Sequence, residues 1–334
     1  MRVVLCGAGH IGAVHAANLA ASDRVTELVV AYLDAGRARE LAAATGARAA
    51  TPDQAFALGP AAVVIAAPTP AHAGLVRRSI AAGIPCFCEK PLSGDVDETV
   101  ELVREVEAAG ADVQVGFMRR FDAGIRALRG MIERGELGRV HTLHIASHDH
   151  EPPDEAYVAV SGGMFRDQLI HDFDMIRWVT ASEVESVYAT GAVRTIAFAE
   201  RHGDVDTCAL VLTMAGGELV LLAGTREDGR GEDVRIEAIG SKDSASAGLN
   251  ARTPLRLLDP IGVETGHPPY VDAIDRFADA YALEMEHFLG IAAGQSTPTC
   301  PPRDALNTML VAVAAERSRA AGGPVAVEHA DDLL

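Results

Sequence analysis

Short apolar runs alternate with longer, alanine-rich stretches over roughly the first third of the chain, up to residue 114. Such runs are typical of buried strands, and the stretches between them are typical of crossover helices. The predicted strands are residues 3–6, 27–33, 62–66 and 85–88, and the predicted helices are residues 10–21, 35–45, 71–82 and 95–109. This alternation predicts βαβ units and a parallel sheet.

The pattern changes after about residue 121, where strand-like runs follow one another with fewer helices between them. The predicted strands are residues 140–148, 184–194, 206–214, 218–225 and 234–239, and the predicted helices are residues 163–179, 270–293 and 304–321. Short connections such as Ala215-Gly216-Gly217 indicate hairpins, so this sheet should be mainly antiparallel. The helices would cover one face and leave the other to solvent or to a partner subunit.

A glycine-rich turn, Gly7-Ala8-Gly9-His10-Ile11-Gly12, joins the first predicted strand to the first predicted helix. In a G-x-G-x-x-G turn the first glycine allows a tight bend, the second lets the backbone approach a pyrophosphate, and the third packs the helix on the sheet. His10 and Ile11 begin the helix, whose N-terminus favours a phosphate. The turn predicts a dinucleotide site at its three glycines and at these two residues.

The chain has 334 residues, enough for two domains of about 150 residues each. We expect an α/β protein with an N-terminal Rossmann dinucleotide-binding domain at residues 1–120. A C-terminal α/β domain with a large, mainly antiparallel open sheet should occupy residues 121–334.

Charge and cysteine content narrow the setting. A net charge of −18 disfavours nucleic acid and anionic membranes as partners. The longest uncharged apolar run, residues 61–67, is far shorter than the roughly 20 residues that span a bilayer. Five scattered cysteines and an N-terminus without a leader-like segment predict reduced thiols and a cytoplasmic protein.

Asp34 ends the second predicted strand, twenty-two residues after Gly12. A carboxylate at this place accepts hydrogen bonds from the ribose hydroxyls and repels a 2′-phosphate, which favours NAD over NADP. Arg37 and Arg39 lie nearby and leave NADP open as an alternative, because an arginine can hold the 2′-phosphate.

Glu89-Lys90-Pro91 ends another predicted parallel strand. Open α/β sheets bind ligands at the carboxyl ends of their strands, so Lys90 should face the nicotinamide end of the cofactor. The alternative is an ordinary surface lysine.

Asp167 and His171 are four residues apart in the predicted helix 163–179, which would place both side chains on one face. An alcohol oxidation needs a base, and His171 titrates near neutral pH while a carboxylate one turn away can hold its ring. Asp172 and Asp174 also neighbour His171, so a solvated cluster without catalytic use stays open as an alternative.

Taken together, these residues resemble the glucose-fructose oxidoreductase and inositol dehydrogenase family, the Gfo/Idh/MocA oxidoreductases. Glu89-Lys90-Pro91 matches the E-K-P signature of that family. The stretches at 116–122 and 161–174 resemble its inositol dehydrogenase branch in particular.

The resemblance implies an NAD-dependent dehydrogenase that oxidises a secondary alcohol of a cyclitol. It implies that the catalytic residues are Lys90, Asp167 and His171. Glu89 and Lys90 would also lie beside the cofactor, and Arg119 would line the substrate pocket together with the three catalytic residues. It also implies a homodimer or homotetramer formed through the C-terminal sheet. A sugar dehydrogenase or reductase of the same family, or a dinucleotide-sensing regulator without turnover, is the alternative.

One position departs from the inositol dehydrogenase pattern. Where that branch often carries tyrosine in a Y-G-Y-D stretch, this chain has Glu232 in Arg230-Gly231-Glu232-Asp233. This puts myo-inositol itself in question and leaves an amino-cyclitol, another modified cyclitol or a sugar as competing substrates.

Two other clusters favour structural roles. His144, His148 and His150 would share one face of an extended segment, but residues two and four apart on a strand seldom converge on one metal ion. Cys86 and Cys88 would be buried, inert thiols. We expect no metal site.

Overall fold

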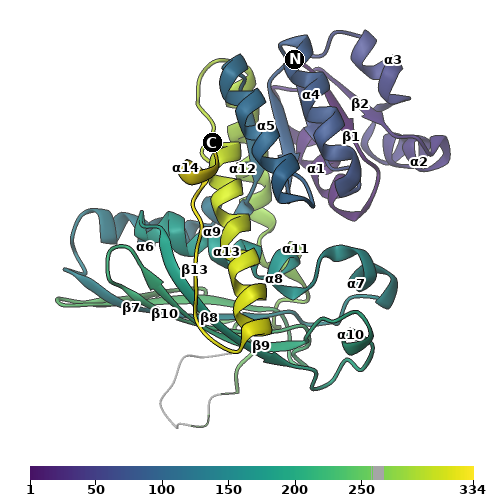
Figure 1. Ribbon diagram of the computed structural model, residues 1–334. Coiled ribbons are helices and arrows are strands. Elements are labelled where there is room, and N and C mark those ends of the chain that lie inside the picture. The colour runs from purple at the N-terminus through teal and green to yellow at the C-terminus, as the bar shows by residue number, and fades with distance from the viewer. Residues whose placement is uncertain (257, 259–266) are drawn as a thin grey trace. The chain divides into compact units, whose positions relative to one another are not determined.

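The computed structural model describes residues 1–256, 258 and 267–334. They form two compact units (Figure 1). Unit 1 contains Met1–Met118, Asp279–Asn307 and Ala330–Leu334, and unit 2 contains Arg119–Ala278 and Thr308–His329. The predicted C-terminal domain contains every residue after 120. In the structure, the chain instead returns to unit 1 after residue 278.

Unit 1 is built on a six-stranded sheet in which all neighbouring strands run parallel. Its strands, in the spatial order β3-β2-β1-β4-β5-β6, are β1 Arg2–Cys6, β2 Glu27–Ala31, β3 Arg48–Ala50, β4 Ala62–Ile65, β5 Cys86–Glu89 and β6 Val113–Gly116. This order is that of the Rossmann fold, so the predicted fold of the first domain is confirmed. Two strands were not predicted: β3 has only three residues, and the apolar run of β6, Val-Gln-Val-Gly, is broken by Gln114.

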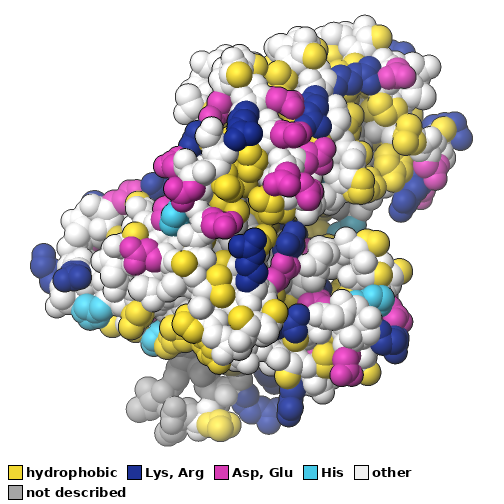
Figure 2. Space-filling model, viewed as in Figure 1, with side chains coloured by type: hydrophobic (Ala, Val, Ile, Leu, Met, Phe, Trp, Pro, Cys, Tyr) yellow, Lys and Arg dark blue, Asp and Glu magenta, His cyan; other side chains and the backbone are white. Residues whose placement is uncertain are grey.

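Helices connect successive strands of this sheet. They are α1 His10–Ala21, α2 Ala35–Thr45, α3 Pro52–Ala57, η1 Thr69–Ala71, α4 His72–Ala82 and α5 Val96–Ala109. Gly46, Gly83 and Gly110 follow α2, α4 and α5 in the left-handed conformation that ends helices. Acidic side chains gather over α4 and α5 (Figure 2), where Arg77 contacts Glu98 and Glu105.

The core of unit 1 also contains the helix α12, Ala278–Ala292. Met285, Phe288 and Leu289 are at most 1% exposed and belong to the same apolar cluster as Leu5 and Phe87. The prediction that one helix spans 270–293 and covers the second sheet was therefore wrong in both respects. The helix is divided after α11, Ala273–Arg276, and its apolar side chains complete the core of the first sheet.

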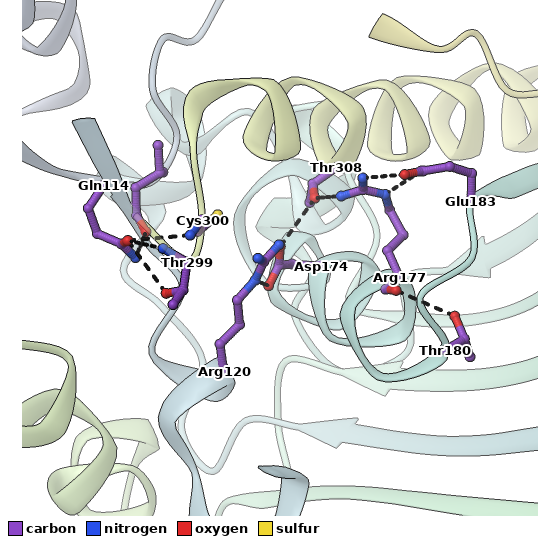
Figure 3. Close-up of polar contacts among 10 residues, drawn as sticks. Gln114, Arg120, Asp174, Arg177, Thr180, Glu183, Thr299, Cys300 and Thr308 are labelled. Atoms are coloured by element: carbon purple, nitrogen blue, oxygen red, sulfur yellow. Dashed lines mark hydrogen bonds and ion pairs between the residues drawn. The ribbon is translucent and has the colours of Figure 1, made fainter. Parts of the chain in front are cut away.

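A buried amide fixes the segment that follows α12. The side-chain oxygen of Gln114, on β6, accepts hydrogen bonds from the backbone N–H groups of Thr299 at 2.8 Å and Cys300 at 3.3 Å (Figure 3). Val115 N–H donates to the Cys300 carbonyl at 2.9 Å. These bonds satisfy polar groups that burial would otherwise leave unpaired. The chain ends in α14, Ala330–Leu333.

Unit 2 contains a seven-stranded mixed sheet. Its strands, in the order β12-β11-β7-β10-β9-β8-β13, are β7 Val140–His148, β8 Val184–Ala192, β9 Thr207–Met214, β10 Leu219–Thr225, β11 Asp233–Gly240, β12 Ser244–Ala247 and β13 Val325–Ala326. β7 and β10 pair in parallel and the other neighbours pair antiparallel. The expected large, mainly antiparallel sheet is therefore confirmed.

The remaining helices of this part of the chain are η2 Met118–Phe121, α6 Ala123–Glu133, α7 Glu155–Ser161, α8 Met164–Asp167, α9 Ile170–Thr180, α10 Phe198–Arg201 and α13 Pro302–Ala321. A buried ion pair and a buried hydrogen bond hold α9 in place. Arg120 contacts Asp174 at 2.6 Å, and Thr308, on α13, accepts a hydrogen bond from Arg177 at 2.9 Å (Figure 3). No helix among the described residues is long and apolar enough to cross a membrane.

The predicted helix 163–179 is interrupted. Asp167 ends α8 and His171 is the second residue of α9, with a turn at Gln168 and Leu169 between them. Residues four apart share a face only within one regular helix, so the spacing of Asp167 and His171 does not place their side chains on one helix face. Leu169, in this turn, is 0% exposed, and the side-chain amide of Gln168 donates to the carbonyl groups of Ser147 and Thr225.

Candidate active site

The glycine-rich turn of unit 1 has the geometry that a pyrophosphate requires. Gly7 has φ +131°, and a Cβ there would lie 2.2 Å from the Ala66 carbonyl oxygen. A Cβ on Gly12 would lie 2.9 Å from the Gly7 carbonyl oxygen, so α1 packs closely on the turn. A Cβ on Gly9 would meet no atom within 4 Å, which leaves room beside the backbone at the N-terminus of α1. The turn fits a dinucleotide.

A pocket of about 530 Å³ adjoins this turn and is lined by Gly7, Asp34, Ala67, Pro68 and residues around them. Asp34 is exposed, and its Oδ1 accepts hydrogen bonds from the N–H groups of Gly36 at 2.8 Å and Arg37 at 3.1 Å. The carboxylate thus caps α2, and no described residue donates to Oδ2. One oxygen of Asp34 therefore remains for a ribose hydroxyl.

Lys90 follows β5 directly, at the carboxyl end of the parallel sheet. Glu89 is 8% exposed, its Oε1 lies 2.6 Å from Nε2 of His15, and its Oε2 accepts a hydrogen bond from the Lys90 N–H at 3.2 Å. His15 is fully buried on α1 and packs edge-on against Phe87. Glu89 therefore fixes the backbone at Lys90 and is itself fixed by the helix of the glycine-rich turn.

Asp167, in unit 2, lies in a polar network that the sequence analysis missed. The Tyr157 hydroxyl, on α7, donates to Asp167 Oδ1 at 2.7 Å, and Nη1 of Arg226 lies 3.5 Å from Oδ2. Arg226 is 1% exposed and also lies 3.4 Å from Asp204. Tyr157 as a whole is 48% exposed, but loss of water around its hydroxyl and the nearby Asp167 raise its pKa, so the phenol keeps its proton and remains a donor.

His171 is half-buried beside a second fixed carboxylate. Asp172 is fully buried and accepts a hydrogen bond from Arg119 at 2.5 Å. Burial raises the pKa of Asp172, and the Arg119 guanidinium counters this. Arg119 is 5% exposed, and its Nε donates to no described residue. The structure thus brings Arg119, Asp167 and His171 into unit 2 and places Lys90 in unit 1.

A pair of carboxyl groups faces the same network. Asp233 pairs with His148 across β11 and β7, so Glu232 and Asp149 stand opposite each other where those strands meet the loops. Glu232 is 4% exposed and accepts a hydrogen bond from the His150 N–H at 3.1 Å. Burial raises the pKa of Glu232 to about 7, and burial together with Glu232 raises the pKa of Asp149 well above its usual range.

The other clusters have structural partners. His148 Nδ1 lies 2.9 Å from the Thr225 hydroxyl and His150 Nδ1 lies 2.8 Å from the Asp228 carbonyl. Within the described ranges, no three His, Cys, Asp or Glu side chains are grouped to hold a metal. The five cysteines are all buried, and burial raises the pKa of Cys6 and Cys86 to about 12, so these thiols stay protonated.

Tyr157 and Arg226 were missed for different reasons. Arg226 directly follows the apolar strand β10. A charged residue in that position can indicate a functional group at the end of the strand, so the sequence did contain a signal for Arg226. Tyr157 lies in a short helix with no clear apolar periodicity. Only the fold brings its hydroxyl to Asp167.

One class of two-domain oxidoreductases combines a dinucleotide-binding unit with an α/β unit. The α/β unit carries paired carboxylate, histidine and arginine side chains, as unit 2 does here. The family models assign this chain within that class. Residues 1–117 match the oxidoreductase family with an NAD-binding Rossmann fold, and residues 125–246 match the GFO/IDH/MocA C-terminal domain. The chain belongs to the GFO/IDH/MocA family and is an NAD-dependent oxidoreductase, which confirms the prediction from its sequence.

Relatives of known name match nearly the whole chain. It is 36% identical to a myo-inositol dehydrogenase of Streptomyces leeuwenhoekii, over 98% of this chain and 100% of that protein. It is 31% identical to the scyllo-inositol 2-dehydrogenase (NAD⁺) of Bacillus subtilis, over 98% and 96%. A solved structure of a putative myo-inositol dehydrogenase from Sinorhizobium meliloti is 35% identical, with a TM-score of 0.90 over 98% of this chain and 100% of that one.

Proposed function

We propose that the protein oxidises a secondary alcohol of a cyclitol to the ketone, with NAD as the hydride acceptor. The observation that carries this proposal is the network around Asp167, where a phenol and a buried guanidinium hold a carboxylate close in sequence to a histidine. Similarity to proteins named inositol dehydrogenases, over nearly the full length of both chains, supports the same substrate class.

In this proposal, each candidate side chain has a task of its own. His171 takes the hydroxyl proton, Lys90 donates a hydrogen bond to the same oxygen, and Asp167 orients the ring of His171 or binds a neighbouring hydroxyl. Arg119 holds Asp172, the neighbour of His171, through a buried ion pair. NAD, when bound at the glycine-rich turn and Asp34, supplies the acceptor for the hydride that leaves the carbon.

The test is a substrate panel with the purified protein. Myo-inositol, scyllo-inositol, an aminoinositol and several aldoses are each incubated with NAD and with NADP, and formation of the reduced cofactor is followed by absorbance. We expect turnover of at least one cyclitol. Binding of NAD without turnover of any alcohol or ketone in the panel would instead support a dinucleotide-sensing regulator.

An amino-cyclitol is a second candidate substrate, and the Glu232–Asp149 pair favours it. Burial raises the pKa of Glu232 to about 7, and burial together with Glu232 raises the pKa of Asp149 well above its usual range, so these opposed carboxyl groups bind protons more readily than ordinary surface carboxylates. A substrate ammonium group would stabilise both as carboxylates. In the panel, a higher kcat/KM for aminoinositol than for myo-inositol would establish this candidate.

We further propose a homo-oligomer formed through the outer face of the unit 2 sheet. Strand register places Tyr188, Val211 and Leu221 side by side across β8, β9 and β10, and these apolar side chains are 41–46% exposed. They border a depression of about 400 Å³. Exposed apolar patches of this kind mark interaction sites. The five buried, unpaired thiols agree with the cytoplasmic location that we also propose.

A further inference from the structure

His72, the first residue of α4, is a buried histidine that the proposed mechanism does not use. It is 1% exposed. Its Nδ1 lies 2.8 Å from the Pro91 carbonyl oxygen and its Nε2 lies 2.8 Å from the Ala67 carbonyl oxygen. Carbonyl oxygens only accept hydrogen bonds, so each contact uses a ring N–H.

The two carbonyl groups belong to two different parts of unit 1. Ala67 follows β4 and lines the pocket that also contains Asp34 and Gly7. Pro91 follows Lys90 at the end of β5. β4 and β5 are neighbours in the sheet, so His72 bridges the carboxyl ends of two adjacent strands.

The backbone on the other side of Lys90 is fixed independently. Glu89 accepts a hydrogen bond from the Lys90 N–H and is itself bonded to His15. Glu89 therefore holds the chain before the Lys90 side chain, and His72 holds it after. A side chain that donates a hydrogen bond to a reacting oxygen depends on such fixed neighbours, since a misplacement of about 1 Å can cost about 100-fold in rate.

We propose that His72 is a positioning residue for Lys90. Through its two ring nitrogens, His72 couples the wall of the dinucleotide pocket to the turn that carries Lys90. This inference rests on the proposed catalytic role of Lys90. It assigns a separate task to each ring nitrogen. The bond from Nδ1 to Pro91 sets the placement of Lys90, and the bond from Nε2 to Ala67 sets the pocket wall.

Two substitutions separate these tasks. In His72→Asn the amide nitrogen can occupy the place of Nδ1 and keep the bond to Pro91, and in His72→Gln it can occupy the place of Nε2 and keep the bond to Ala67. With myo-inositol as the alcohol, we expect His72→Gln to lower kcat by about 10- to 100-fold with little change in the Kd for NAD. His72→Asn should keep kcat within about threefold and raise the Kd for NAD.

The control is Ser79→Ala, which removes another buried polar side chain of α4 whose hydroxyl donates to the Leu75 carbonyl. Thermal unfolding is measured for each variant. A merely structural role for His72 would lower the unfolding temperature of both His72 variants and change their kcat equally. Equal kcat values for His72→Asn and His72→Gln would therefore overturn the inference.

A double-mutant cycle with Lys90→Ala separates this inference from the proposed function. If His72 acts through Lys90, His72→Gln should lower kcat by less than about twofold in the Lys90→Ala background. A full, additive loss there would overturn the inference while leaving the role of Lys90 intact. Parental kcat in Lys90→Ala alone would overturn the proposed role of Lys90 and the inference with it.

Discussion

The cofactor preference can be tested at Asp34, whose two carboxylate oxygens have different tasks. Oδ1 caps α2 through the N–H groups of Gly36 and Arg37, while no described residue donates to Oδ2; the residue lines the pocket. Asp34→Asn removes the charge and keeps a side chain that caps helices equally well. Asp34→Ala removes both the charge and the cap. Comparing these two variants therefore separates the effect of the Asp34 charge on cofactor preference from the effect of the helix cap on stability.

The expected magnitudes follow from the exposure of Asp34. At about 4 Å in water a pair of unit charges interacts by about 1 kcal/mol, and a 2′-phosphate carries a charge of about −1.5 to −2. Repulsion of about 1.5–2 kcal/mol corresponds to about 10- to 30-fold in kcat/KM. Loss of the cap costs about 1 kcal/mol, or about 2–4 °C in unfolding temperature for a unit of this size.

The assay compares kcat/KM for NAD and NADP in the parent and both variants, together with thermal unfolding. We expect the parent to prefer NAD and both variants to narrow that preference by about 10-fold or more. Only Asp34→Ala should unfold at a lower temperature. A parent that prefers NADP would refute the reasoning and assign control of the cofactor to Arg37 or Arg39, and an unchanged ratio in Asp34→Asn would refute it as well.

Three further predictions concern unit 2 and the proposed base. His171→Ala should lower kcat by at least about 100-fold, and its residual activity should rise with pH where the parent has levelled off, since solvent hydroxide replaces the base; parental kcat would show that the base lies elsewhere. Because burial raises the pKa of Glu232 from 4.5 to about 7, the folded state binds this proton more tightly and parental stability falls as pH rises between these values. Glu232→Gln should therefore unfold at a higher temperature than the parent at pH 8 but not at pH 4, and equal unfolding temperatures at pH 8 would contradict the burial argument. Val211→Asp places a charge in the centre of the exposed apolar row and should lower the molar mass found by light scattering, whereas an unchanged oligomer would exclude this face as the interface.

Local patterns were sufficient to predict most of the architecture. The alternation of apolar runs with alanine-rich helices specifies a parallel sheet because crossover helices bury both of its faces. The glycine-rich turn was recognisable because the close approach of Gly7 to Ala66 and of Gly12 to Gly7 excludes any side chain. Lys90 follows β5 directly and Asp34 lies three residues after the end of β2, so their place at the carboxyl edge of the sheet could be predicted from the chain order.

Contacts between distant segments could not be predicted in this way. The apolar residues of α12 look the same whichever sheet they cover, and only packing placed Phe288 against Phe87. The helix that the sequence pattern left continuous is interrupted by a turn at Gln168 and Leu169, which the pattern does not reveal.

The sequence by itself determined which side chains can do the chemistry and which strand or helix carries most of them. Only the tertiary structure decided which groups meet: Tyr157 with Asp167, Glu232 with Asp149, and His72 with the carbonyl groups of Ala67 and Pro91. The physical reason is that hydrogen bonds and pKa shifts depend on distance and burial, which arise when segments far apart along the chain pack together. Local periodicity reports only which face of an element is apolar.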